Sequence, residues 1–223
     1  MCNLYSQTRA QDAVRGLFRV QHELDLTGNL PSMPAIFPAH NAPVVRLNET
    51  GQRSLMIMNW GFVMPQQEKV ARRITNARDD KVRASPFWRG SFEERRCLVP
   101  VTSFAEPKGK KPAVWHWFAR KGDEPRPLFS FAGLWRPWKG RLKPGGEFVD
   151  MQVFAILTTS PNEIVAPIHP SRMPVMLASE AAYDTWLNGT AEEAFALAKP
   201  FPADDMRIVA RGEKEDAGLD ILA

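Results

Sequence analysis

The chain has 223 residues, of which 44% are hydrophobic and 24% charged, a balance typical of a globular protein. No apolar run is long enough to span a membrane, and the first 20 residues do not resemble a secretory signal. Two cysteines and four histidines without paired spacing predict neither a disulfide framework nor a metal site, and the standard phosphate-binding loops are absent. We expect a cytoplasmic protein without a metal or a cofactor.

Taken in chain order, the predicted elements are short and mostly extended. The spacing of Val14, Leu17 and Phe18 predicts a helix over residues 6–20, and a loop rich in Pro, Gly and Asn follows over residues 27–43. Strands are predicted over residues 44–47, 55–60, 97–104, 113–119, 128–135 and 152–158, with hairpin loops at 108–111 and 139–146. Helices are predicted over residues 180–187 and 191–199. We expect one α+β domain over residues 1–223, built on antiparallel sheet, with a frayed tail over residues 211–223.

Charge is unevenly distributed along the chain. Residues 68–143 carry 19 basic and 8 acidic side chains, whereas residues 144–223 carry 5 basic and 13 acidic ones. Six of the seven tryptophans fall in or, for Trp60, just before the basic segment. Basic and aromatic side chains together favour single-stranded nucleic acid, because phosphates attract cations and bases stack on rings. The alternative is a solvated basic face over a core that holds the tryptophans.

Cys2 follows the initiator methionine directly, and a residue as small as cysteine allows Met1 to be removed. The mature chain would then begin with a 1,2-aminothiol. About one α-amine in seven is neutral at pH 7, so it can attack an aldehyde, and the thiol can close a five-membered thiazolidine. The alternative is a second-position cysteine of no significance.

Three other places carry candidate chemistry. Asn76 and Arg78 lie in a basic stretch, residues 71–83, that also contains Arg83, and they suit phosphate and sugar contacts or a simple turn. Glu106 ends an apolar run, so it is either ion-paired or able to shuttle protons. His169 lies in a loop framed by prolines, where it is held as a titrating group or as a turn residue.

Together these segments resemble the SOS-response-associated peptidase (SRAP) family, the proteins that shield abasic sites. The matching segments, in order, are residues 1–2, 59–65, 75–78, 95–100, 104–106, 131–135, 158–159, 168–169, 172–175 and 186–187. The resemblance implies a compact α+β domain with antiparallel sheets around a barrel-like core, flanking helices and a basic DNA channel. It also implies a monomer that acts on abasic sites in single-stranded DNA and associates with the nucleoid when bound.

The resemblance also implies roles for individual residues. Cys2 would be the nucleophile through both its amine and its sulfur, with Asn76 orienting it. Glu106 would shuttle protons during Schiff-base formation and ring closure, and His169 would act on the sugar oxygen in ring opening and crosslink reversal, with lyase activity as a companion reaction. The implied DNA-binding residues are Arg78 and Arg172 on phosphates and Trp60 near the flanking bases, and the basic stretch adds Arg83.

The chain departs from the family pattern in three places. The family commonly begins Met-Cys-Gly-Arg-Tyr, whereas here Asn3 and Leu4 follow Cys2, and Leu4 cannot contact a phosphate. Pro107 replaces an aromatic residue after Glu106, and the spacing from His169 to Arg172 is one residue longer than usual. Two alternative functions remain: a thiol peptidase that uses Cys2 and His169, and a single-strand binder without catalysis.

Overall fold

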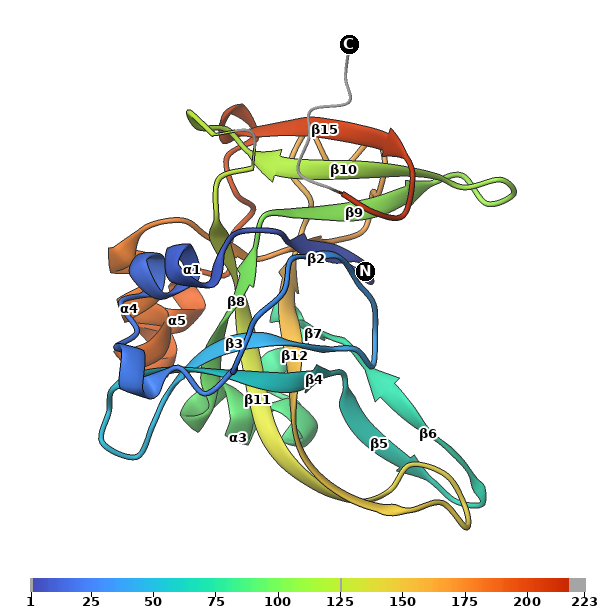
Figure 1. Cartoon of the computed structure of the whole chain (residues 1–223). Helices are drawn as coiled ribbons and strands as arrows, with labels where there is room; N and C mark the ends of the chain where they lie inside the picture. Colours follow the sequence, from blue (N-terminus) through green and yellow to red (C-terminus); the bar gives the residue numbers. More distant parts are fainter. Residues whose placement is uncertain (1, 125, 217–223) are drawn as a thin grey trace.

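The computed structural model describes residues 2–124 and 126–216, and strands dominate its backbone (Figure 1). The strands are β1 (Tyr5–Gln7), β2 (Met33–Ile36), β3 (Asn41–Leu47), β4 (Arg53–Trp60), β5 (Phe62–Gln66), β6 (Lys69–Ile74), β7 (Asn76–Arg78), β8 (Arg96–Val101), β9 (Ser103–Lys108), β10 (Val114–Arg120), β11 (Phe129–Arg141), β12 (Phe148–Thr159), β13 (Met173–Pro174), β14 (Met176–Leu177) and β15 (Met206–Gly212). The α-helices are α1 (Gln11–Phe18), α2 (Asp79–Val82), α3 (Pro86–Glu94), α4 (Glu180–Asn188) and α5 (Ala191–Ala196), with short 3-10 turns at His22–Leu24 and Ala203–Asp205.

Five strands close into a barrel. β4 pairs with β3, β3 with β8, β8 with β11 and β11 with β12, all antiparallel, and β12 returns to β4 in parallel. The short strand β7 also pairs with β12 in parallel. The α+β class and the barrel-like core are therefore confirmed, with two parallel pairings in an otherwise antiparallel sheet.

A second sheet lies across one end of the barrel (Figure 1). Its strand order is β15-β10-β9-β1-β2, with every neighbouring pair antiparallel. The chain passes from the barrel to this sheet at Thr102, the single residue between β8 and β9. The predicted strand over residues 97–104 is thus two strands of different sheets. This junction places the start of β9 beside the barrel end.

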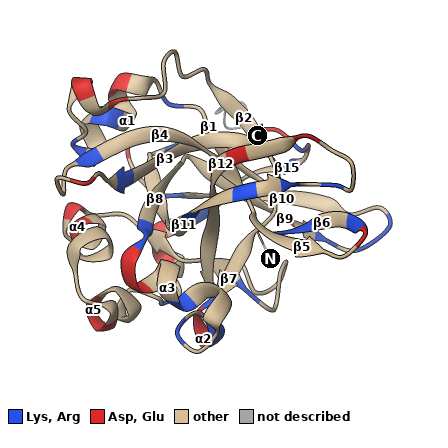
Figure 2. Cartoon of the chain, turned by 90° about the horizontal axis from the view of Figure 1, so that it is seen from below, with Lys and Arg blue, Asp and Glu red and all other residues tan. Residues whose placement is uncertain are grey.

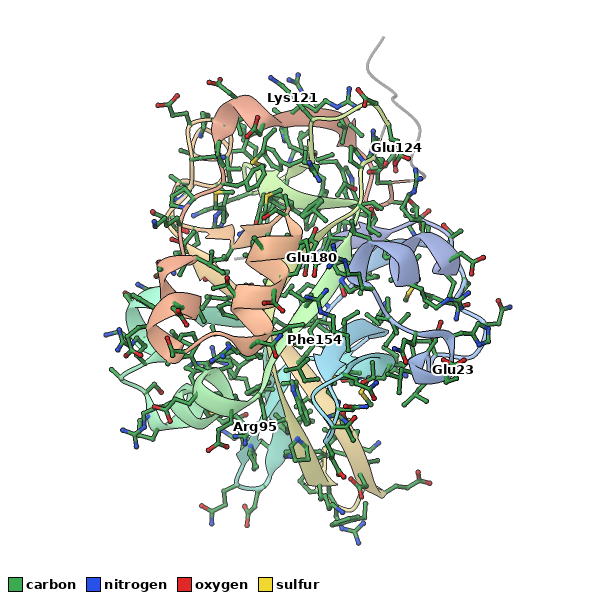
Figure 3. All side chains as sticks on the ribbon, turned by 90° about the vertical axis from the view of Figure 1, so that its left-hand side faces the viewer. Glu23, Arg95, Lys121, Glu124, Phe154 and Glu180 are labelled. Atoms are coloured by element: carbon green, nitrogen blue, oxygen red, sulfur yellow. The ribbon has the colours of Figure 1, made fainter. Side chains whose placement is uncertain are left out.

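Alternate residues of the barrel strands face two different apolar clusters. On β12, Val153 and Ala155 pack with side chains from α1, α3 and α4, whereas Phe154 and Ile156 face the opposite cluster, which includes Cys2 and Tyr5. The helices lie outside the barrel, so the second cluster fills its interior and continues under the second sheet. Arg53 on β4 forms an ion pair of 2.8 Å with Glu180, the first residue of α4. Figure 3 shows Glu180 on the side of α4 that faces the α1 segment.

Several local predictions were wrong at their boundaries. The helix predicted over residues 6–20 spans only Gln11–Phe18, because Tyr5–Gln7 pairs with two strands as β1. The loop predicted over residues 27–43 contains β2 and the start of β3. Hairpin β5–β6 and helix α3 were not predicted. In each case tertiary pairing or packing overrides weak local signals.

The predicted tail is ordered over its first part. β15 continues to Gly212, and the side chain of Asp216 is fully buried against Arg126. The prediction of a frayed segment from residue 211 is therefore wrong as far as residue 216, and residues 217–223 lie outside the described residues. Within the described part of the chain, no helix is long and apolar enough to cross a membrane.

Gly133 on β11 lies opposite Cys97 on β8, and neighbouring side chains already occupy the place where a Cβ would stand. A Cβ at position 133 would lie 2.8 Å from Cys97 Sγ and 2.9 Å from a methyl of Val99. We expect Gly133→Ala to lower the free energy of unfolding by about 1–3 kcal/mol through overpacking. Urea denaturation measures this, and adding Cys97→Ala should reduce the loss. A double variant that shows the summed losses of the two single variants would contradict this contact.

Candidate functional site

The pairing of β1 with β9 brings Cys2 close to Glu106. Tyr5 faces Phe104 and Ser6 faces Ser103, and the amide of Ala105 donates to the carbonyl of Leu4 at 3.0 Å. Because the strands are antiparallel, the chain that runs back from Ser6 to Cys2 lies alongside the chain that runs forward from Ser103 toward Glu106. Both side chains are buried. Two residues that are 104 positions apart in the sequence thus share one interior site.

Asn76 holds the backbone of Cys2 from the barrel side. Its Nδ2 donates to the Cys2 carbonyl at 2.8 Å and to Thr75 Oγ1 at 2.8 Å. Thr75 in turn donates to Asn3 Oδ1 at 3.1 Å. The side-chain oxygen of Asn76 is buried without a hydrogen-bond partner among the described residues.

Thr75 and Asn3 were not predicted as site residues. Thr75 lies in the matching segment 75–78, and Asn3 stands where the family commonly has glycine. Together with Asn76 they hold the first residues of the chain on both sides of the Cys2–Asn3 peptide bond.

Glu106 is a buried carboxyl group without a hydrogen bond. Its side chain is 1% exposed, and neither oxygen has a hydrogen-bond partner within the described residues. Burial raises the pKa of Glu106 to about 7. A carboxyl group with this pKa can both accept and donate a proton near neutral pH.

His169 lies on the other side of Glu106. Its Nε2 is 4.0 Å from Glu106 Oε2, and its Nδ1 lies 2.8 Å from the carbonyl of Arg172. Because a carbonyl only accepts, this contact assigns the proton to Nδ1 and leaves Nε2 as the acceptor of a neutral ring. Burial lowers the pKa of His169, which favours that neutral form. The structure thus brings together Cys2, Asn76, Glu106 and His169.

The thiol of Cys2 is protonated at neutral pH. Burial raises its pKa well above the ordinary value, and the nearby charge of Glu106 raises it further. The thiol contacts the carbonyl of Leu4 at 3.7 Å. Nucleophilic sulfur at this site therefore requires a base that removes the proton during the reaction.

Three arginines expected to contact DNA are engaged in ion pairs. Arg172 bonds to Asp79 and to the carbonyl of Thr158, and its side chain is only 12% exposed. Arg83 pairs with Glu192 of α5 at 2.9 Å. Arg78 bonds Asp80 through two contacts, at 2.9 and 2.7 Å, but it is 51% exposed and adjoins Asn76. Of these arginines, Arg78 is the one both exposed and next to the site.

Trp60 has a different position from the expected one. It is completely buried, and its Nε1 donates to the carbonyl of Thr75 at 3.1 Å, with its ring packed against Tyr5. The expectation that Trp60 lies near flanking bases is therefore wrong. Trp117 and Trp186 are also buried, so the core interpretation is correct for these three tryptophans.

The side chain of Leu4, one of the departures from the family pattern, is packed in the interior. Leu4 is fully buried against a small apolar cluster that includes Ala105, Trp117 and Val209. Pro107 pairs with Trp115 across β9 and β10. The Leu4 position therefore stabilises the second sheet and presents no charge.

Charge is separated on the surface. Figure 2 shows acidic residues on α4 and α5, whose sequences contain no Lys or Arg, and basic residues on hairpin β5–β6. A cavity of about 580 Å³ lies beside that hairpin, lined by residues such as Val70, Leu142 and Lys143, and it contains none of the four clustered residues. The four clustered residues and this cavity are thus in different places.

Comparison with known proteins identifies the family. The family model described as SOS response associated peptidase (SRAP) matches residues 1–212. The chain belongs to this family. It is 32% identical over 181 residues to the abasic site processing protein YoqW of Bacillus subtilis, covering 77% of this chain and 75% of that protein. It is 29% identical over 213 residues to the abasic site processing protein YoaM of the same organism, covering 92% and 88%.

Solved structures share the fold of this SRAP protein. A crystal structure of a protein from Bordetella bronchiseptica superposes with a TM-score of 0.70 at 21% identity, covering 95% of this chain and 98% of that one. A protein from Bacteroides thetaiotaomicron gives a TM-score of 0.68 at 22% identity, covering 94% and 92%. The barrel with its second sheet is thus a recurrent arrangement.

The buried carboxyl group of Glu106 should reduce stability at alkaline pH. Its folded-state pKa is raised, so the folded protein holds a proton that the unfolded chain has released above pH 4.5, and stability falls as pH rises from there through about 7. Glu106→Gln should therefore stabilise the protein at pH 8 by up to about 3 kcal/mol, at about 1.4 kcal/mol per pKa unit. Near pH 4 this gain should vanish.

Urea denaturation at the two pH values measures the difference. The exposed Glu163 supplies the matched control, Glu163→Gln, which should change neither value. An equal effect of Glu106→Gln at both pH values would show that the carboxyl group titrates normally.

Proposed function

We propose that this SRAP protein forms a covalent thiazolidine with abasic sites in single-stranded DNA, through Cys2 after removal of Met1. The observation that supports it most is the set of unpartnered acceptors around Cys2. Asn76 Oδ1 and both oxygens of Glu106 are buried without hydrogen-bond partners among the described residues. Buried acceptors are costly unless a donor meets them, and an α-amine and a sugar hydroxyl are donors.

The amine acts first in this proposal. The neutral α-amine of Cys2 adds to the aldehyde carbon of the ring-opened sugar, and Glu106 passes one proton from the nitrogen to the aldehyde oxygen, which becomes a hydroxyl. The same carboxyl group then passes the second amine proton to this hydroxyl, which leaves as water and gives the neutral Schiff base. A pKa of about 7 suits Glu106 to both directions of transfer.

The thiol closes the ring in the second step. Cys2 Sγ adds to the imine carbon, and its proton goes to the imine nitrogen through Glu106, so the two steps release one water in total. Because burial raises the pKa of the thiol, sulfur does not compete as a free thiolate before the imine forms. The attack is intramolecular and benefits from proximity.

In this proposal His169 acts on the sugar. Its neutral Nε2 faces the site near Glu106 and can accept the proton of the sugar hydroxyl during ring opening. The reverse transfer would assist release of the crosslink, and β-elimination at the Schiff base would be the companion lyase reaction.

The peptidase alternative receives less support from this geometry. A peptidase would use Cys2 as a thiolate, whereas burial and Glu106 keep its thiol protonated. The relatives named above are called abasic site processing proteins, which agrees with a DNA substrate. The other alternative, a passive single-strand binder, predicts that no adduct forms in the following test.

Intact mass measures the proposed reaction directly. The untagged protein should lose the mass of Met1 and then gain one abasic oligonucleotide less one water. Cys2→Ala should abolish the adduct, and Cys97→Ala should not, because Cys97 is buried in a different position on β8. Blocking the α-amine while the thiol remains should also abolish it. A chain with free Cys2 that stays unmodified would refute the proposal.

Reversible binding is best measured in a Cys2→Ala background. There, Arg78→Ala should weaken binding and reduce the slope of log affinity against log salt by about 0.7, the value for one phosphate contact on a single strand. Asp80→Asn should strengthen binding, since Asp80 competes for Arg78. Arg83→Ala, whose side chain pairs with acidic α5, should change the slope less. Equal slopes for the parent and Arg78→Ala would exclude Arg78 as a phosphate contact.

A further inference from the structure

A buried ion pair joins the C-terminal segment to the connection between β10 and β11. Arg126 Nε lies 2.7 Å from Asp216 Oδ2, and Nη2 lies 2.9 Å from Oδ1. The two side chains are 2% and 0% exposed. A bidentate pair removed from water in this way is costly to bury, and removing one partner is costlier still. Neither residue takes part in the chemistry proposed above.

The carboxylate of Asp216 is also bonded to the start of β9. Ser103 Oγ donates to Asp216 Oδ2, and Ser103 Oγ lies 2.7 Å from Ser6 Oγ on β1. Since the hydroxyl proton of Ser103 points to the carboxylate, Ser103 accepts from Ser6. The charge of Asp216 thus orients both hydroxyl groups that face each other across β1 and β9.

The backbone around Asp216 adds two more ties. The amide of Asp216 donates to the carbonyl of Pro34 on β2, at 3.0 Å. Trp117 on β10 donates through Nε1 to the carbonyl of Glu213, at 2.9 Å. The segment after β15 therefore contacts β2 and β9, which flank β1 in the sheet, and β10, which lies beyond β9.

The contact between Ser6 and Ser103 sets a register with a direct consequence for the site. Ser6 lies four residues after Cys2, and Ser103 lies three residues before Glu106. β1 has only three residues, so few other backbone bonds hold it in place. A slip of one residue would turn every side chain of the strand to the opposite face and move Cys2 away from Glu106.

We infer that Asp216 is a positioning residue for Cys2, which acts from the C-terminal segment by fixing the register of β1 against β9 through Ser103 and Ser6. Its catalytic consequence rests on the proposed function. The structural consequence does not, because the amides of Thr102 and Ala105 donate to the carbonyls of Ser6 and Leu4 and report the pairing without DNA.

The test uses two variants of the full chain and one control. Asp216→Asn keeps the shape but removes the charge that orients Ser103. The double variant Arg126→Met with Asp216→Leu removes both charges and fills the space with apolar groups, which restores stability to many buried pairs. Asp150→Asn breaks an exposed pair with Lys139, whose side chains are 64% and 61% exposed, and serves as the control.

Two readouts are needed: hydrogen exchange at the amides of Thr102 and Ala105, and the rate of adduct formation at saturating abasic DNA. Asp216→Asn should speed exchange at both amides by about tenfold or more, leave exchange in β11 and β12 unchanged, and slow the adduct rate by about tenfold to a hundredfold. DNA affinity should stay constant. The double variant should regain the parental urea midpoint yet remain slow in adduct formation and fast in exchange at β1.

Two results would overturn the inference. One is unchanged exchange at Thr102 and Ala105 in Asp216→Asn. The other is a double variant that recovers the adduct rate together with its stability, because the ion pair would then act only on the global fold. If the parental protein forms no adduct, the proposed function fails, whereas the exchange experiment still decides whether Asp216 fixes the register.

Discussion

The antiparallel pairing of β1 with β9 is the constraint on which the candidate site depends. It sets Tyr5 against Phe104 and Ser6 against Ser103, and it continues through the bond from the Ala105 amide to the Leu4 carbonyl. Cys2, which the proposed function makes the reactive terminus, thereby comes to a fixed place beside a buried carboxyl group. Chain termini are ordinarily mobile, so a reactive terminus needs this kind of support on both sides. The barrel supplies the second side through Asn76, which β7 carries alongside β12.

The site holds polar groups whose burial lowers stability. Glu106 and Asn76 have buried oxygens without hydrogen-bond partners among the described residues, and the thiol of Cys2 lies fully inside. Such groups persist where function requires them, because each would be removed if stability alone decided. Their cost is offset by the apolar interior around them, where Tyr5, Trp60 and Phe131 pack edge to face. The tryptophan that the charge pattern associated with DNA is therefore part of the support for the site.

The sequence was more informative about chemistry than about geometry. Cys2, Asn76, Glu106 and His169 were selected for their reactivity and for the family resemblance, and the structure brings all four together. Their proximity could not follow from spacing, since it depends on strand pairings between distant segments. The buried position of Trp60 and the ion pair of Arg172 could not be predicted for a related reason: ring and guanidinium groups serve equally well inside a core or an ion pair as on DNA. Asp216 gave no signal, because an aspartate in a polar segment looks the same whether it is solvated or buried.

The paired arginines bear on how DNA could approach this surface. The basic segment of the sequence has a net charge of +11 over residues 68–143, yet Arg78 is bonded to Asp80 and Arg172 to Asp79. A phosphate that reaches Arg78 must replace the carboxylate of Asp80. The binding free energy gained is therefore only the difference between the phosphate contact and the carboxylate contact. Because Trp60, Trp117 and Trp186 are buried, base stacking on them adds nothing. Binding built in this way is weak per contact and strongly dependent on salt. Under the proposed function such weak binding is sufficient, since the thiazolidine, rather than the phosphate contacts, would then hold the strand.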